Sequence, residues 1–174
     1  WDQKACTASL VHYVEGDEGF ALAYSEALRR ALAQWDTLLP RPLSLAAQGQ
    51  LRLLKRGALA RGWWFENGRA PDLRSAVVYT REPFDLSLHP MSRFVVVRRV
   101  DRLEDALPWI GPSVATAGVF PLRALREMRD LLAAAGVSGV FPLGESERAW
   151  PGMPHDGMRI LSELVSWTSS GERA

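Results

Sequence analysis

The second half of the chain alternates between apolar segments and helical segments, and this alternation constrains the fold more than any other feature. The apolar segments are rich in β-branched and aromatic residues, which favour buried strands, and they cover residues 94–100, 114–120 and 137–143. Helical spacing is found between them, at residues 103–109 and 121–135. Strands that are joined through helices pair in parallel, by right-handed crossovers. The order therefore predicts an α/β fold with a mostly parallel sheet flanked by helices.

The first half of the chain adds one strand and two helices. Residues 10–14 are typical of a strand, and Asp17 can cap the helix that follows it. Pro40 ends that helix, and Ser44 is the candidate N-cap of a second helix that extends to Gly62. We expect these two consecutive helices to form one packed layer.

Two further strands and a final helix complete the predicted fold. Residues 63–65 and 76–80 have strand character, and the turn dipeptide Asn67-Gly68 lies between them. Near the C-terminus, a helix is predicted from residue 158 to about residue 167. We expect a single α/β domain with no internal boundary.

The composition excludes several classes of protein. With 47% hydrophobic and 24% charged residues among 174, the chain is neither disordered nor collagen-like, and it can bury a core without metals or disulfides. A net charge of +1 does not provide the positive field that general binding to nucleic acids or acidic membranes requires. No segment reaches the roughly 18 to 20 apolar residues of a membrane helix. A lone free cysteine is consistent with a reducing cytoplasm, where we expect the protein to be located.

Cys6 is the candidate nucleophile. It lies in a small polar segment just ahead of the first strand, where the N–H groups of a turn can lower the pKa of a thiol and bind an oxyanion. The alternative is a buried and inert thiol, since cysteine is among the most often buried residue types. As the only cysteine, it can form neither an internal disulfide nor a cysteine-based zinc site.

His155 is the candidate general acid or base. It lies in residues 151–157, where two prolines and two glycines surround the pair His155-Asp156. Constrained loops on a rigid scaffold are places where catalytic groups concentrate, and Asp156 can orient the imidazole. The alternative is a structural turn, with Asp156 as the N-cap of the last helix.

The other two histidines have different environments in the sequence. His12 lies inside the first strand and is interpreted as a hydrogen-bonded structural residue. His89 precedes Pro90 on a loop, from which it can approach a site or simply meet solvent. Because the three histidines share no metal-ligand spacing, we expect no metal site.

Basic and aromatic side chains form two further groups. Four basic residues gather on the predicted second helix, namely Arg52, Lys55, Arg56 and Arg61. They can contact the phosphates of a nucleotide or coenzyme A, or form a solvated face, which is the commoner case. Trp35 and Trp109 fit core positions, whereas Trp63 and Trp64 can line an acyl channel or pack on one side of the sheet.

Several segments resemble one known family. Gln3-Lys4-Ala5-Cys6, followed by the strand His12-Tyr13-Val14-Glu15, resembles the nucleophile region of the long-chain acyl-CoA reductases of the LuxC type, in the aldehyde dehydrogenase superfamily. The later matches follow in the same order: Pro90-Met91-Ser92-Arg93-Phe94-Val95-Val96-Val97, Val114-Ala115-Thr116-Ala117-Gly118, Trp150-Pro151, Pro154-His155-Asp156-Gly157 and Leu164-Val165-Ser166-Trp167. The similarity extends from Asp2 to Trp167.

This resemblance implies an aldehyde-dehydrogenase-like catalytic domain over residues 1–174. Cys6 would attack a fatty acyl thioester, and coenzyme A or a partner acyl-protein would leave. NADPH would then deliver hydride to the enzyme-bound acyl group, and the aldehyde would be released. A thiolate suits this chemistry because it accepts an acyl group from another thioester at little free-energy cost. We expect His155 to assist proton transfer to or from the leaving group.

The resemblance also implies components outside this chain. The chain begins at Trp1, and we expect it to be part of a longer protein whose N-terminal domain binds most of the NADPH. That protein is expected to form oligomers and to work with an acyl-protein synthetase. Most aldehyde dehydrogenases carry Glu-x-Phe-Gly-Pro, with the Glu on the nicotinamide ribose, where this chain has His89-Pro90-Met91-Ser92-Arg93. The usual cofactor contact is therefore not carried over.

Two alternative functions stay open from the sequence. Cys6 can serve acyl transfer or thioester hydrolysis without any reduction, in which case the thiol is acylated but no NADPH is oxidised. The chain can also be a non-catalytic interaction module that keeps the fold around an inert thiol. The alkylation rate of Cys6 at neutral pH separates this last alternative from the other two.

Overall fold

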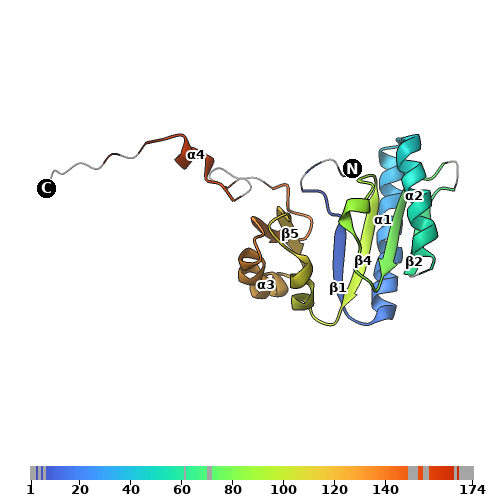
Figure 1. The fold of residues 1–174 in the computed structure, drawn as a ribbon, viewed down its shortest axis with the longest axis horizontal. Helices are drawn as coiled ribbons and strands as arrows, with labels where there is room; N and C mark the ends of the chain where they lie inside the picture. Colours follow the sequence, from blue (N-terminus) through green and yellow to red (C-terminus); the bar gives the residue numbers. More distant parts are fainter. Residues whose placement is uncertain are drawn as a thin grey trace. The chain divides into compact units, whose positions relative to one another are not determined.

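The computed structural model describes residues 3, 5, 7–60, 62–69, 72–148, 153–154, 157–166 and 168. The chain divides into two compact units, unit 1 (Trp1–Ala106) and unit 2 (Leu107–Ala174), and each is considered by itself (Figure 1). The division falls inside the 3-10 helix η2 (Leu103–Trp109). The sequence does not indicate a boundary between two units there, because strands and helices alternate through this region without interruption.

Unit 1 is built on a four-stranded sheet in the order β1-β4-β3-β2. Its strands are β1 (Val11–Glu15), β2 (Gly62–Asn67), β3 (Ser75–Thr80) and β4 (Phe94–Val100). β4 pairs in parallel with both β1 and β3, whereas β2 pairs antiparallel with β3 at the opposite edge. All four strands lie where the sequence predicts them, and the sheet is mixed but mostly parallel.

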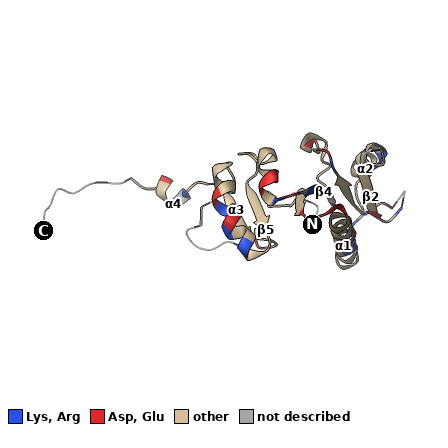
Figure 2. Cartoon of the chain, turned by 90° about the horizontal axis from the view of Figure 1, so that it is seen from below, with Lys and Arg blue, Asp and Glu red and all other residues tan. Residues whose placement is uncertain are grey.

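Helices α1 (Glu18–Leu38) and α2 (Leu45–Ala58) cover opposite faces of this sheet (Figure 2). Successive residues of a strand point to opposite faces, so Val77 packs in a core with α1 while Val78 packs in a core with α2. The expected single layer of two helices is therefore wrong. The predicted caps are confirmed, since Asp17 Oδ1 accepts from Phe20 N at 2.7 Å and Ser44 Oγ accepts from Ala47 N at 3.2 Å.

Unit 2 contains a two-stranded parallel sheet of β5 (Thr116–Val119) and β6 (Gly139–Pro142), joined through α3 (Leu122–Ala134). This strand–helix–strand segment confirms the predicted elements. However, β5 pairs with β6 in a separate sheet, whereas β4 pairs with β1 and β3. The expectation that β4, β5 and β6 form one parallel sheet is therefore wrong. Gly136 follows α3 with a φ of +99°, a conformation that glycine adopts without steric cost.

The predicted length of the last helix is wrong, and so are the predicted core positions of two tryptophans. The last helix, α4 (Ile160–Glu163), has only 4 residues, and Arg159 at its start provides no capping hydrogen bond. Trp35 and Trp109 are 50% and 48% exposed and not in the core. Trp35 lies near the end of α1, whose 21 residues extend over about 31 Å at 1.5 Å per residue, farther than a five- to seven-residue strand reaches.

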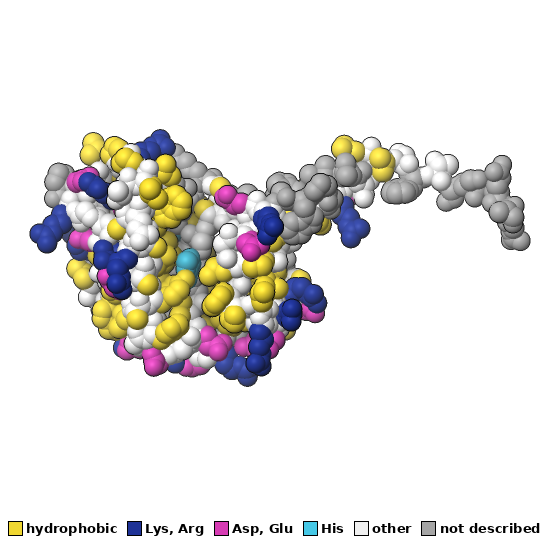
Figure 3. Space-filling model, turned by 180° about the vertical axis from the view of Figure 1, so that it is seen from behind, with side chains coloured by type: hydrophobic (Ala, Val, Ile, Leu, Met, Phe, Trp, Pro, Cys, Tyr) yellow, Lys and Arg dark blue, Asp and Glu magenta, His cyan; other side chains and the backbone are white. Residues whose placement is uncertain are grey.

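The surface of the described chain mixes residue types. Figure 3 shows hydrophobic side chains interspersed with charged ones on the face seen there. Large exposed hydrophobic residues include Leu45 and Leu53 of α2. No helix in the part of the chain that the structure describes is long and apolar enough to cross a membrane.

Candidate active site

Gln3, the first residue of the Gln-Lys-Ala-Cys motif, is buried at the amino end of the unit 1 sheet. Its Nε2 donates to Ser9 O and to Phe94 O, both at 2.7 Å, and its Oε1 accepts from Phe94 N at 2.9 Å. The backbone pairing of the two strands starts further along, where Val96 N donates to Leu10 O at 3.0 Å. The side-chain amide of Gln3 therefore supplies the next set of hydrogen bonds at the point where β1 and β4 begin.

Cys6 and His155, the two predicted catalytic residues, lie outside the described residues, as does Asp156. The neighbours of Cys6 in the chain are described, and Ala8 N donates to Ala5 O at 3.0 Å. Three peptide units separate Gln3 from Cys6, so their Cα atoms lie at most about 11 Å apart. The roles of Cys6 and His155 stay predictions.

His89 is a buried, neutral imidazole on the loop before β4. Its Nδ1 accepts a hydrogen bond from Met91 N at 3.1 Å, which leaves the proton on Nε2. Burial lowers its pKa to about 4, against the opposing effect of the carbonyls of Phe94 and Leu10. Within the described ranges Nε2 has no hydrogen-bond partner, and the ring packs 5.1 Å from that of Phe94. The ring of His89 thus packs against the side chain of the same residue, Phe94, whose backbone N–H and C=O bind Gln3.

The loop that carries His89 is held by a buried ion pair. Met91 and Arg93 adopt φ values of 49° and 53°, which are strained for residues with a side chain. Arg93 is 1% exposed, and its Nη1 donates to Arg41 O at 2.7 Å and lies 3.5 Å from Asp36 Oδ1. Burial raises the pKa of Asp36, opposed by the hydrogen bond from Ser75 and the charge of Arg93. Sequence reasoning missed this network, because its members are far apart in the chain.

His12 is a structural residue, as predicted. Its Nδ1 forms a hydrogen bond with the Tyr24 hydroxyl at 2.7 Å, between β1 and α1. Burial lowers the pKa of His12 to about 4 and raises that of Tyr24. The pair therefore fixes a helix to the sheet and carries no charge near neutral pH.

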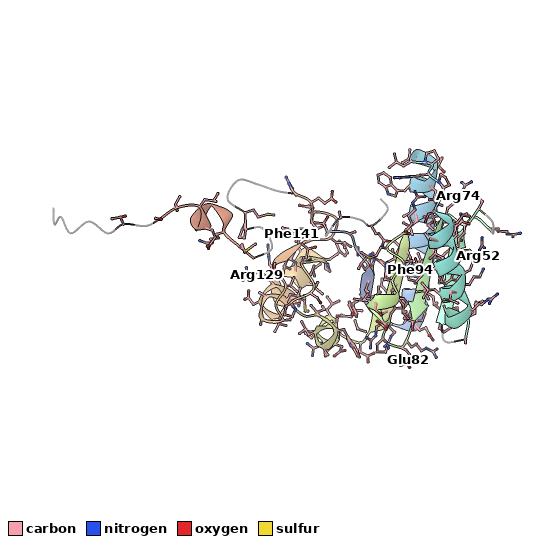
Figure 4. The ribbon with its side chains drawn as sticks, turned by 45° about the horizontal axis from the view of Figure 1, so that its top comes forward. Arg52, Arg74, Glu82, Phe94, Arg129 and Phe141 are labelled. Carbon is pink, nitrogen blue, oxygen red and sulfur yellow. The ribbon has the colours of Figure 1, made fainter. Side chains whose placement is uncertain are left out.

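The basic residues of α2 form a solvated face, of which Arg52 is labelled in Figure 4. Lys55 pairs with Glu66 at 2.7 Å, and Arg52 Nη2 lies 3.4 Å from Gln48 Oε1. Arg56 is exposed, and Arg61 lies outside the described residues. These contacts favour the surface interpretation over a phosphate site.

Trp63 and Trp64 occupy opposite faces of β2, as successive residues of a strand must. Trp63 packs 5.2 Å from the Tyr79 ring, and Arg81 lies over it at 5.2 Å. Trp64 packs 5.7 Å from Phe94 in the other core. The two indoles therefore line neither one channel nor one side of the sheet.

Two open cavities have linings that include neither Gln3 nor His89. One of about 420 Å³ lies in unit 1 and is lined by Asp17, Glu18, Tyr79, Arg81 and Arg99. Its arginines are already engaged, Arg81 with Glu18 at 2.7 Å and Arg99 with Gly16 O at 2.6 Å. The other, of about 500 Å³, lies in unit 2 between α3 and the end of β6. In the described ranges no group of three or more His, Cys, Asp or Glu residues is placed to hold a metal ion.

Comparison with known proteins gives a consistent result. The sequence model of the acyl-CoA reductase (LuxC) family matches residues 1–167. A long-chain acyl-protein thioester reductase of Photorhabdus luminescens is 37% identical over 81 residues, which is 46% of this chain and 17% of that protein. The long-chain acyl-protein thioester reductase 2 of Photobacterium leiognathi is 24% identical over 172 residues, 97% of this chain and 35% of that protein.

The curated relatives are much longer than this chain. A further long-chain acyl-protein thioester reductase, from Vibrio harveyi, is 32% identical over 82 residues, which cover 47% of this chain and 17% of that protein. This chain thus spans about a third or less of the relatives it matches. Since the family match extends over nearly all of the sequence, the chain belongs to the acyl-CoA reductase (LuxC) family.

Proposed function

We propose that this chain is the nucleophile-bearing part of an enzyme that reduces a long-chain fatty acyl thioester to the aldehyde. The observation that carries the proposal is the family match over residues 1–167, which includes Cys6 in its motif. The names of the relatives, long-chain acyl-protein thioester reductases, support an acyl thioester of coenzyme A or of a partner protein as substrate. We place the domain in the aldehyde dehydrogenase superfamily and the protein in the cytoplasm.

In this proposal Cys6 carries the acyl group. Its thiolate attacks the thioester carbonyl, a new carbon–sulfur bond forms, and the bond to the leaving thiolate breaks. His155 holds the proton that the leaving thiolate takes up. NADPH, which we assign mainly to residues outside this chain, supplies hydride to the acyl carbon when bound. The aldehyde leaves as the bond to Cys6 breaks, and Cys6 returns to a thiolate.

The first experiment measures acylation of the intact chain by palmitoyl-CoA. We expect mass spectrometry to show one palmitoyl group on Cys6, the only cysteine. Cys6→Ala should abolish the adduct. Ser9→Ala removes an exposed hydroxyl three positions from Cys6 and should leave the adduct unchanged, because Ser9 binds Gln3 through its backbone carbonyl.

The second experiment tests the reduction. A longer protein that contains this chain and an upstream nucleotide-binding domain should oxidise NADPH and release aldehyde in a Cys6-dependent reaction. Acylation without NADPH oxidation would indicate acyl transfer or hydrolysis instead. An unacylated wild-type chain, or full turnover in Cys6→Ala, would overturn the proposal.

A further inference from the structure

We propose that Gln3 is a positioning residue, which fixes the segment carrying Cys6 to the start of β4 and so sets the reactivity of the thiol. This inference rests on the proposed function of Cys6. Gln3 is buried and lies three residues before the predicted nucleophile. It forms hydrogen bonds with both the N–H and the C=O of Phe94, 91 positions away in the chain.

The hydrogen bonds of Gln3 use both donors and one of the two acceptor sites of its primary amide. The two N–H donors of Nε2 reach Ser9 O and Phe94 O, and Oε1 accepts from Phe94 N. A glutamate keeps the shape but loses both donors and sets a carboxylate oxygen against two carbonyls. An asparagine is one methylene shorter and cannot reach in the same way.

Burial makes these contacts costly to lose. Gln3 is 8% exposed and Phe94 is fully buried, so water does not readily replace the amide. Without the glutamine, the N–H and C=O of Phe94 at the end of the β1/β4 ladder lose their hydrogen-bond partners. Because Gln3 is hydrogen-bonded to both groups of Phe94, the segment that contains Gln3 is held in one arrangement relative to β4.

The anchor acts on Cys6 through the covalent chain. The short tether from Gln3, together with the hydrogen bond from Ala8 N to Ala5 O, limits where the intervening residues can move. Displacement of a reacting group by about 1 Å can reduce a rate by roughly 100-fold. The position of the thiol should therefore depend on the Gln3 amide, although Gln3 itself touches no reacting atom in this proposal.

The test compares Gln3→Glu and Gln3→Met with the wild-type chain. We measure the rate of Cys6 acylation by palmitoyl-CoA between pH 5 and pH 8, and the hydrogen exchange of the Phe94 amide. At pH 8 both variants should react roughly 10- to 100-fold more slowly than wild type. The Phe94 amide should exchange faster in Gln3→Met, which lacks the oxygen that accepts from Phe94 N. Gln50→Glu makes the same chemical change at an exposed position of α2 and should change neither.

The pH profile separates positioning from a general loss of structure. As the pH falls, the carboxyl introduced by Gln3→Glu takes up a proton and regains a donor, so its rate relative to wild type should recover. Gln3→Met keeps the length of the side chain but has no titratable group, so its relative rate should stay low. Equal rates for all chains would overturn the inference, as would slow acylation of Gln3→Met with an unchanged Phe94 amide, or equal recovery of both variants. If the wild-type chain is not acylated, the proposed function itself fails.

Discussion

Lowering the pH from 7 to 5 should reduce the free energy of unfolding of unit 1 by about 4 kcal/mol, about 2 kcal/mol for each of two histidines. Burial lowers the pKa of His12 and of His89 from 6.5 to about 4. Between these values the unfolded chain binds more protons than the folded chain, so stability falls as the pH falls. Below about pH 4 both states are protonated and this effect levels off.

Urea denaturation of the intact chain at several pH values measures this dependence. His12→Gln and His89→Gln should each remove about half of the slope between pH 7 and pH 5, whatever their stability at pH 7. Carboxyls with a lowered pKa, such as those of Glu26 and Asp85, contribute stability that is lost only below this pH window. Burial raises the pKa of Asp36, which acts in the opposite sense. A flat profile above pH 5 in the wild-type chain would contradict the buried, neutral histidines.

Replacing Arg93 by methionine should destabilise unit 1 by about 3 to 5 kcal/mol, because it leaves the buried carboxyl of Asp36 without its charged partner. Both side chains are almost inaccessible, at 1% for Arg93 and 4% for Asp36. The same substitution removes the hydrogen bond to Arg41 O, which ties the loop before β4 to the segment after α1. The measurement is chemical denaturation at pH 7.

Arg102→Met is the matched control in unit 1. Its ion pair with Glu104 is formed at 2.9 Å, but the two side chains are 73% and 39% exposed, so we expect a loss of less than about 1 kcal/mol. In a double-mutant cycle, Asp36→Asn should recover part of the loss caused by Arg93→Met, because it removes the uncompensated charge. Equal effects of Arg93→Met and Arg102→Met would show that the buried pair contributes no more than a surface pair.

Local signals in the sequence predicted local structure well. Asp17 and Ser44 both cap helices, because a short polar side chain at a helix start needs only backbone N–H groups within three residues. The arrangement of elements was harder to predict. The choice of sheet face for α2 depends on which alternate residues of β3 meet Leu51 and Ala47, and two apolar faces of one strand look alike in the sequence.

The candidate site shows the same limit. The motif at Gln3 could be recognised from the sequence, but its bond to Phe94 joins residues that no local pattern relates. The pairing of Asp36 with Arg93 spans 57 positions and was missed for the same reason. The sequence places His89 on a loop from which it can approach a site, and the structure adds its burial and its packing against Phe94.

The last link between β1 and β4 is encoded by one side chain and not by the backbone. Hydrogen bonds between main chains survive almost any substitution, whereas those of Gln3 can disappear in a single mutational step. The strength with which the amino-terminal segment is attached to the sheet can therefore change by a single substitution at residue 3. Selection or engineering can loosen or tighten it without altering any strand.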